Sequence, residues 1–366
     1  TSYYHYYRAN GLVRHPGGYM GEDVDVLYDF INSGYPEGRE WCDCNVRDEI
    51  LVANTDRITG DLNEFWEGRD YANQLGKLKA AVLIAHGFND WNVMPEHSVR
   101  IYERLKAKGT PLQAYFHQGG HGGSPPADHM NRWFSRFVCG IENGVKGDAQ
   151  SWVVREGVSR KSPTEYGAYP HPNSKGVSLY PGGDGTQRGS LGPRAGKGTQ
   201  TLVDDVAFKG ADLARIDTSP NRLLFTTPIL KHDLHLSGYS EVTIRLASNR
   251  PAANLSVWLV SLPWTKKGKI NANLITRGWA DPQNHASIKE SQPLVPGKFV
   301  EFSFRLEPDD QVIPAGQQIG MMIFSSDREF TLWPESGTEL TVDLGATSLN
   351  LPVVGGRGAL KRAMGR

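Results

Sequence analysis

The chain has 366 residues, and its 40 Lys and Arg residues are balanced by 40 Asp and Glu residues. This length exceeds one ordinary domain core, so it predicts two domains. A neutral chain lacks the basic surface that nucleic acid or an anionic membrane attracts, and no apolar run reaches the roughly 18 residues of a membrane span. The 41 glycines and 22 prolines favour many turns and therefore a large β component.

Residues 1–150 are predicted to form part of an α/β domain. Residues 80–85 are a continuous apolar run, as in a strand that is buried on both faces of a parallel sheet. A helix is expected over 95–108, a second strand over 112–117 and a second helix over about 127–139. Two parallel strands do not make a stable sheet, so we expect partner strands from a segment before Thr1.

The stretch from about residue 10 to 77 carries helical pieces but no sheet-like run. We expect it to be an insertion that forms a helical cap over the sheet.

Residues 151–366 are predicted to form an all-β domain, because short strands alternate with turn residues and no helical period appears. This texture favours a β-sandwich, specifically a galactose-binding-like jelly roll. We expect a loop-rich bridge over 160–200 and a frayed tail from Gly355. The strands are expected at 223–226, 242–246, 255–262, 273–278, 299–306, 318–324, 329–333 and 339–344.

Two polar residues follow the two predicted parallel strands. Asp90 comes shortly after the first strand, and His121 stands in the Gly-rich loop after the second. Open α/β sheets bind ligands at the carboxyl ends of their strands, so both side chains are expected at one sheet edge. An acid that orients an imidazole, placed before the His in the chain, matches the order of the α/β-hydrolase triad.

A nucleophile for this pair is not evident. No Ser has Gly at both the second position before it and the second position after it, as a nucleophile elbow requires. Ser124 and Ser190 each have only one of these glycines. We expect the attacking Ser to lie before Thr1, so that this chain carries the acid and the base of a triad.

Further candidates have ordinary structural explanations beside functional ones. The tyrosines Tyr3, Tyr4 and Tyr6 suit core packing or a flat apolar pocket. Glu22 suits the first turn of a helix or the binding of a cation. His232 and His235 lack a third ligand, so we predict no metal site.

Several motifs resemble the bacterial Xaa-Pro dipeptidyl-peptidases. They are the tyrosine-rich start with Arg8-Ala9-Asn10-Gly11, the run Gly21-Glu22-Asp23, His86-Gly87 with Asp90-Trp91-Asn92-Val93, and Gly120-His121. In the second half, 275–279, 314–316 and 325–327 resemble the C-terminal sandwich that this group shares with cocaine-esterase-like and α-amino-acid ester hydrolases.

The resemblance implies a serine exopeptidase that releases N-terminal Xaa-Pro dipeptides from proline-containing peptides without a cofactor. It implies that Asp90 is the triad acid and His121 the general base. It also implies that Tyr3, Tyr4 and Tyr6 line the proline pocket, and that Glu22 and Asn92 bind the free α-amino group. The missing N-terminal part of the same enzyme would be its partner. A homodimer is compatible with this, as is either a cytoplasmic or a secreted location.

Two alternatives stay open. The first is a related esterase or β-lactam acylase of the same fold. The second is a carbohydrate-binding sandwich that follows a non-catalytic remnant, with Trp258, Trp264, Trp279 and Trp333 as sugar platforms. Burial of these tryptophans in the core is the simpler interpretation.

Overall fold

A computed structural model describes residues 13–15, 18–20, 44–45, 49–51, 53–56, 58–265 and 273–365. The candidates Tyr3, Tyr4, Tyr6 and Glu22 lie outside the described residues, as does much of the expected cap. Before the first sheet the structure has a two-stranded ribbon, β1 (Val13–His15) with β2 (Gly18–Met20), and the short helices α4 (Ala53–Thr55), α5 (Glu64–Glu67) and η3 (Tyr71–Lys77).

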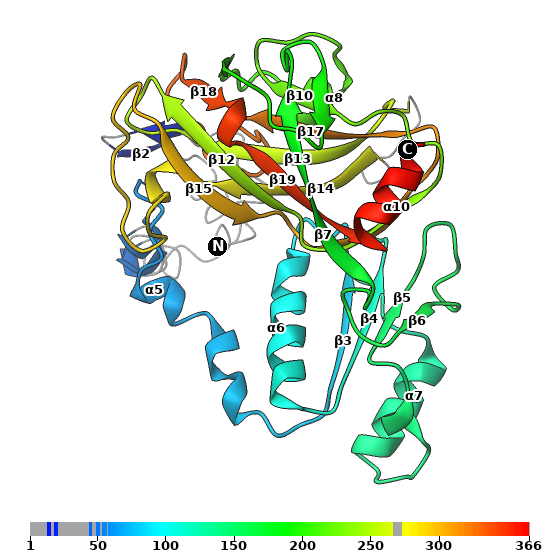
Figure 1. The fold of residues 1–366 in the computed structure, drawn as a ribbon. Helices are drawn as coiled ribbons and strands as arrows, with labels where there is room; N and C mark the ends of the chain where they lie inside the picture. The colour runs from blue at the N-terminus through cyan, green and yellow to red at the C-terminus, as the bar shows by residue number, and fades with distance from the viewer. Residues whose placement is uncertain are drawn as a thin grey trace.

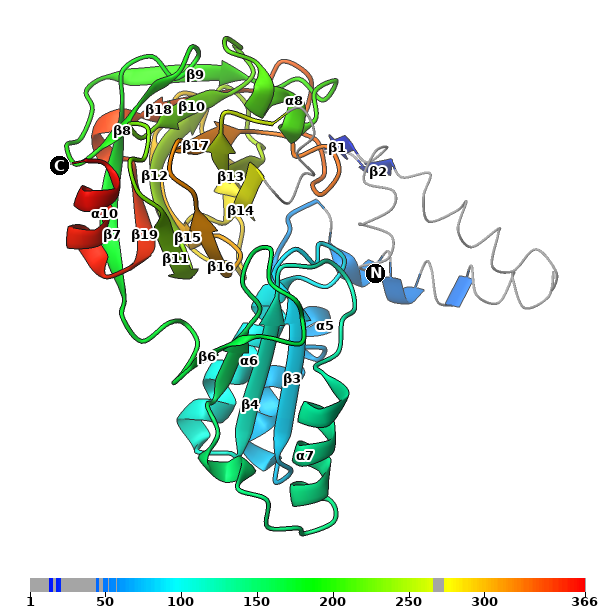
Figure 2. The same cartoon turned by 90° about the vertical axis from the view of Figure 1, so that its right-hand side faces the viewer.

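The α/β part contains a four-stranded sheet in the order β3-β4-β5-β6 (Figures 1 and 2). The first three strands are parallel and β6 is antiparallel. Its elements are β3 (Val82–Gly87), α6 (Pro95–Lys108), β4 (Leu112–His117), α7 (Ala127–Phe137), η4 (Val145–Gly147), β5 (Ser151–Val153) and β6 (Thr164–Tyr166). The predicted strands and helices are confirmed with nearly their predicted bounds. Strands β5 and β6 were not predicted, because three residues are too few to show a period.

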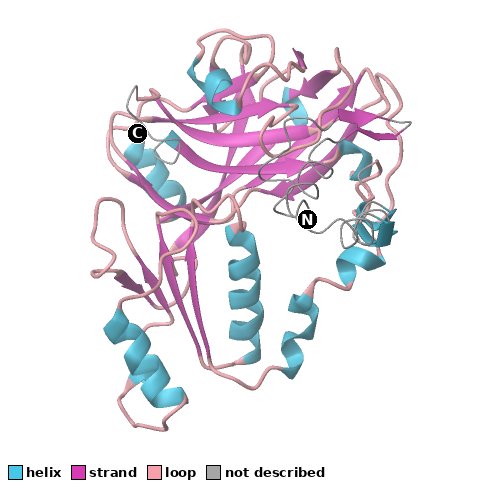
Figure 3. Cartoon of the chain, turned by 180° about the vertical axis from the view of Figure 1, so that it is seen from behind, coloured by secondary structure: helices cyan, strands magenta, loops and turns pink. Residues whose placement is uncertain are grey.

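Helix α6 covers one face of this sheet, and α7 lies on the other side (Figure 3). The apolar stripe of α6 is Val99, Tyr102 and Leu105, and it packs with Ala114 and Phe116 of β4 in one buried cluster. A parallel strand between two helices needs apolar side chains on both faces, and every residue of β4 is buried. Gly87 and His117 are paired, so β3 and β4 end side by side.

The second part is built from thirteen paired strands among the described residues. They are β7 (Ser174–Gly182), β8 (Gly189–Gly192), β9 (Thr199–Val203), β10 (Leu223–Thr226), β11 (Leu234–Gly238), β12 (Glu241–Ser248), β13 (Leu255–Leu262), β14 (Leu274–Ala280), β15 (Val300–Arg305), β16 (Asp309–Ile313), β17 (Gln318–Phe324), β18 (Glu339–Asp343) and β19 (Ser348–Val354). The helical segments between and after them are α8 (Gly210–Arg215), η5 (Pro282–Asn284), η6 (Leu344–Ala346) and α10 (Gly356–Ala363).

Strand β7 joins two groups of strands, because its first residues pair with β19 and its last residues pair with β8. Side chains of both groups meet in one core, with Phe225, Leu259 and Ile323 from one group and Ile244 and Leu351 from the other. One face of these strands therefore fills a shared interior, and the other face of β10, β13 and β17 is buried in a second cluster with Leu224, Trp258 and Met322.

The structure corrects three expectations in this part. Residues 329–333 form turns and a lone bridge rather than a strand. The expected bridge over 160–200 instead contributes β6, β7, β8 and β9, because glycine and proline are tolerated at the ends and edges of strands. The tail does not fray: Leu360 and Ala363 of α10 are buried against the core.

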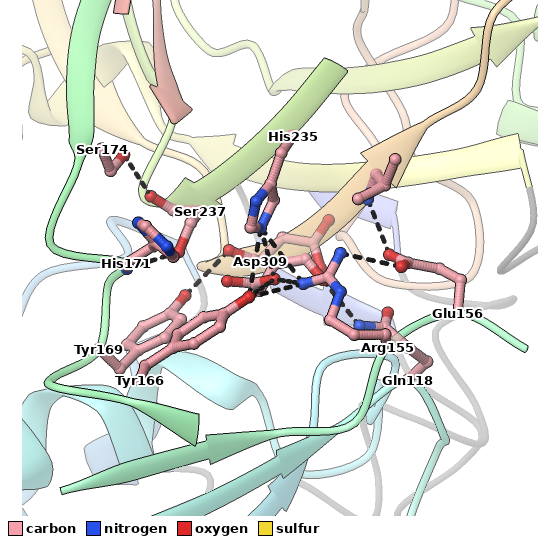
Figure 4. Close-up of polar contacts among 12 residues, drawn as sticks. Gln118, Arg155, Glu156, Tyr166, Tyr169, His171, Ser174, His235, Ser237 and Asp309 are labelled. Carbon is pink, nitrogen blue, oxygen red and sulfur yellow. Dashed lines mark hydrogen bonds and ion pairs between the residues drawn. The ribbon is translucent and has the colours of Figure 1, made fainter. Parts of the chain in front are cut away.

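A buried polar cluster joins the two parts (Figure 4). The Asp310 carboxylate forms an ion pair with Arg155 and lies 2.9 Å from Nε2 of His235. The Tyr166 hydroxyl also donates to the Asp310 carboxylate, over 3.2 Å. The cluster fixes how the α/β part sits against the β part.

Candidate active site

Asp90 lies in the loop that leads from β3 into α6, and its residue is only 3% exposed. Its Oδ1 accepts the backbone N–H groups of Asn92 and Val93, each over 3.0 Å. Two backbone donors on one carboxylate oxygen fix the orientation of the group. The other oxygen, Oδ2, is left for partners outside the loop.

His121 supplies one such partner from the loop that follows β4. Its Nδ1 lies 3.0 Å from Oδ2 of Asp90, as the predicted adjacency requires. A carboxylate only accepts, so Nδ1 carries the proton and Nε2 keeps its lone pair. The His121 side chain is 64% exposed. A neutral imidazole held in this tautomer, with Nε2 accessible, is able to accept a proton from a hydroxyl.

His86 is a second histidine at the same carboxylate. Its Nε2 lies 3.3 Å from Oδ2 of Asp90. The same nitrogen is 2.9 Å from the Val93 carbonyl, and Nδ1 contacts the Ser98 hydroxyl. His86 therefore contacts the Asp90 carboxylate directly, and Ser98 holds the imidazole of His86. The signal in the sequence was the spacing of four residues between His86 and Asp90 across a tight turn.

The loop that carries His121 packs closely on the buried His117. Gly119 N–H donates to Nδ1 of His117 over 3.0 Å, so its Nε2 bears the proton. A Cβ at Gly123 would lie 2.6 Å from that Nε2, and a Cβ at Gly87 would overlap the Gly119 carbonyl. Burial, and then the charge of Arg160, lower the pKa of His117 and keep it neutral. The glycines of this region thus permit close contact between two loops.

A cavity of about 430 Å³ opens beside the Asp90–His121 pair. Its lining includes His86, Ser98 and Ser124 as well as the pair. Neither serine stands in a nucleophile elbow, because Ser98 lies within α6 and Ser124 is followed by two prolines. The pair and its cavity can hold and move a proton at His121 Nε2.

Asn92 is the remaining predicted site residue that the structure describes. Asn92 lies two residues after Asp90 and bonds it through its backbone, and no contact of its side chain is recorded among the described residues. Three or more His, Cys, Asp or Glu side chains do not gather as a metal site anywhere in the described ranges. Within those ranges, no helix is both long and apolar enough to cross a membrane.

Two family models match the chain. The X-Pro dipeptidyl-peptidase (S15 family) model matches residues 1–123, and the X-Pro dipeptidyl-peptidase C-terminal non-catalytic domain model matches residues 143–361. Together they cover most of the sequence.

A relative from Rhodopirellula baltica, provisionally named Xaa-Pro dipeptidyl-peptidase, is 59% identical over 361 residues. The alignment covers 97% of this chain and 58% of the relative, so the chain spans little more than half of that protein's length.

Solved structures share the fold at low sequence identity. An aminopeptidase from a marine-sediment Thaumarchaeota archaeon aligns with a TM-score of 0.66 at 16% identity, over 90% of this chain and 64% of that one. An α-amino acid ester hydrolase aligns with a TM-score of 0.63 at 14% identity, over 87% of this chain and 62% of that one. The family-model matches and the Rhodopirellula relative place this chain in the X-Pro dipeptidyl-peptidase family, S15.

Proposed function

We propose that this chain is the part of a serine exopeptidase that supplies the acid and the base of its triad, and that the enzyme releases Xaa-Pro dipeptides from peptide N-termini. The observation that carries the proposal is the hydrogen bond between Nδ1 of His121 and Oδ2 of Asp90, at the ends of two adjacent parallel strands. The family membership supplies the class of reaction.

In the proposed reaction, a Ser outside this sequence attacks the carbonyl carbon of the proline residue in the substrate. His121 Nε2 takes the hydroxyl proton as the acyl bond forms, and it then gives that proton to the leaving amine. Asp90 stabilises the imidazolium through the bond to Nδ1. Water attacks the acyl-enzyme in a second step with the same proton transfers, so that the dipeptide leaves and the Ser is restored.

Recognition of the dipeptide is assigned by resemblance to the family. Tyr3, Tyr4 and Tyr6 would line the proline pocket, and Glu22 with Asn92 would bind the positive α-amino group. A carboxylate and an amide oxygen suit an ammonium ion, and such a pair near the nucleophile would count two residues from the terminus. Asn92 lies in the Asp90 loop, which is compatible with this role.

Three structural assignments belong to the same proposal. The boundary expected at residue 150 moves past β6, because β5 and β6 pair with the α/β sheet. The stretch 10–77 is assigned as a helical cap, and the second domain as a jelly roll. The partner strands of β3 come from the N-terminal part of the same enzyme.

The test uses the longer polypeptide that contains this chain and the proposed Ser. With a glycyl-prolyl chromogenic substrate, Asp90→Asn and His121→Ala are each expected to lower kcat on the order of 10⁴-fold, because the base loses its orientation or is absent. Asp128→Asn, on the surface helix α7, is the matched control and should keep the wild-type rate. Wild-type rates in both site variants would refute the assignment.

Glu22→Gln separates the exopeptidase from the related esterase or acylase. The exopeptidase is expected to lose its preference for a free α-amine over the N-acetylated substrate. An unchanged preference would favour the esterase alternative.

A further inference from the structure

A short segment of the β part, residues 306–310, contacts both loops of the candidate active site; it comprises the turn after β15 and the first two residues of β16. Glu307 Oε2 accepts the backbone N–H of Glu96, at the start of α6, over 3.0 Å. The backbone carbonyl of Asp310 accepts from Nε2 of Gln118, directly after β4, over 2.7 Å. Gln118 lies against the interface cluster of Figure 4. One segment therefore touches the chain just after Asp90 and just before His121.

The first contact supplies a cap that α6 does not have by itself. The N-cap residue Met94 makes no side-chain hydrogen bond, and Pro95 has no N–H to donate. The N–H of Glu96 is thus the first free donor of the helix, and the Glu307 carboxyl satisfies it from another part of the fold. Since α6 begins where the Asp90 loop ends, Glu307 fixes one end of that loop.

The residue next to Asp90 is held by the same part of the molecule. Trp91 is buried, and the Arg277 guanidinium lies 3.8 Å from the centroid of its ring. Arg277 also lies 3.7 Å from the ring centroid of Phe330. A guanidinium between two aromatic faces is a geometrically specific contact. Glu307 N–H donates to the Arg277 carbonyl over 2.8 Å, so the two anchors are linked.

The second loop is joined to the first by backbone contacts. The carbonyl of Gln118 accepts from the Asn89 side chain over 3.1 Å, and Asn89 N–H donates to the Gly119 carbonyl over 3.1 Å. Gln118 therefore links Asp310 both to the Asp90 loop and to the loop that carries His121. The 3.0 Å separation within that pair depends on two loops that the β part holds from outside.

We propose that Glu307 and Arg277 are positioning residues, through which the β part holds the loop of residues 88–96 so that Asp90 stays within hydrogen-bond distance of His121. This inference rests on the proposed function of the pair. It gives the β part a role in catalysis although none of its residues needs to touch the substrate.

The experiment compares Glu307→Leu, Glu307→Gln and Asp343→Leu in the same longer polypeptide. Gln keeps an oxygen that can accept the Glu96 N–H, whereas Leu does not. Asp343 is the matched control, because its carboxylate caps the short helix η6 by accepting from Gly345 N–H and touches neither loop. The measurements are kcat and KM on the glycyl-prolyl substrate, the pH profile of kcat/KM, and the pKa of His121 by NMR of labelled histidine.

We expect Glu307→Leu to lower kcat at least tenfold with little change in KM, since a misplacement of about 1 Å can cost on the order of 10²-fold. The pH profile of kcat/KM should differ from that of the wild type, because a displaced Asp90 no longer stabilises the imidazolium of His121. Glu307→Gln should restore most of the rate, and Asp343→Leu should change neither readout. Arg277→Met, measured in the same way, should behave like Glu307→Leu.

A folded Glu307→Leu or Arg277→Met protein with the wild-type rate and His121 pKa would overturn the inference. If Glu307→Leu does not fold, Arg277→Met decides. A loss of rate that Gln does not restore would also count against it. The proposed function is judged separately: it fails if Asp90→Asn and His121→Ala are fully active, and it stands if they are inactive while Glu307→Leu is normal.

Discussion

Among the described residues, two Asp–His hydrogen bonds of almost the same length lie in different surroundings. At the sheet edge, His121 binds Asp90 through Nδ1 over 3.0 Å, and at the interface of the two parts His235 binds Asp310 through Nε2 over 2.9 Å. The His121 side chain is 64% exposed beside a cavity, whereas that of His235 is only 22% exposed. An Asp–His contact alone therefore does not indicate catalysis.

What surrounds each carboxylate explains the difference. Asp310 is completely buried and is paired with Arg155 and Tyr166 besides His235, so its charge is compensated within the protein. Asp90 accepts two backbone N–H groups at one oxygen and has two histidines at the other. Among the described residues it forms no ion pair with an arginine. The first arrangement stabilises a domain interface, and the second leaves negative charge to stabilise an imidazolium.

A large effect on stability is expected when the carboxylate of Asp310, at the interface of the two parts, loses its charge. Asp310→Asn is expected to lower the free energy of unfolding by about 3 kcal/mol, because it removes the buried carboxylate of the Arg155 pair and leaves that guanidinium only the more exposed Glu156. Chemical denaturation of the chain measures this. Asp212→Asn is the control, since its pair with Arg215 is exposed and should contribute about 0–1 kcal/mol. Equal effects of the two substitutions would show that the interface cluster does not hold the parts together.

A smaller effect is expected at the glycines of the His121 loop. Gly122 and Gly123 both have positive φ, but a Cβ meets no atom within 4 Å at Gly122, while at Gly123 it meets His117 and Arg160. Gly122→Ala should therefore cost only the backbone term of about 1–2 kcal/mol, and Gly123→Ala about 1–3 kcal/mol more.

Thermal unfolding and kcat/KM of both alanine variants test this difference. Gly123→Ala should also lose activity, because the clash displaces the loop that carries His121. Indistinguishable variants would mean that the contact with His117 does not position the loop.

A pH-dependent effect sharpens the role of Glu307. Burial raises the pKa of Glu307 to about 8 from an ordinary value of 4.5, so the folded protein binds this proton more tightly than the unfolded chain. The stabilisation is fully present below pH 4.5 and is lost as pH rises toward 8, with a slope of at most about 1.4 kcal/mol per pH unit. Because Gln does not titrate, the unfolding free energy of wild type minus that of Glu307→Gln should fall over this window. A pH-independent difference would contradict the assigned shift.

The local pattern of the sequence was sufficient for the elements that carry the site. The apolar run 80–85, the amphipathic stripe of α6 and the mostly apolar β4 each define an element by their own residues. Parallel strand ends then bring Asp90 and His121 to one edge, which is why their adjacency was predictable. The family resemblance added the reaction class.

The tertiary structure decided what depends on residues far apart in the chain. Glu307 at the start of α6 and Arg277 on Trp91 were not predicted, because each contact depends on how separate elements pack. The strands over 174–203 and the buried helix α10 were missed for the same reason: Gly-rich segments have weak local preferences, and pairing with β19 or packing on the core orders them. Sequence thus determined which groups can do the chemistry, and long-range packing determined what holds them in place.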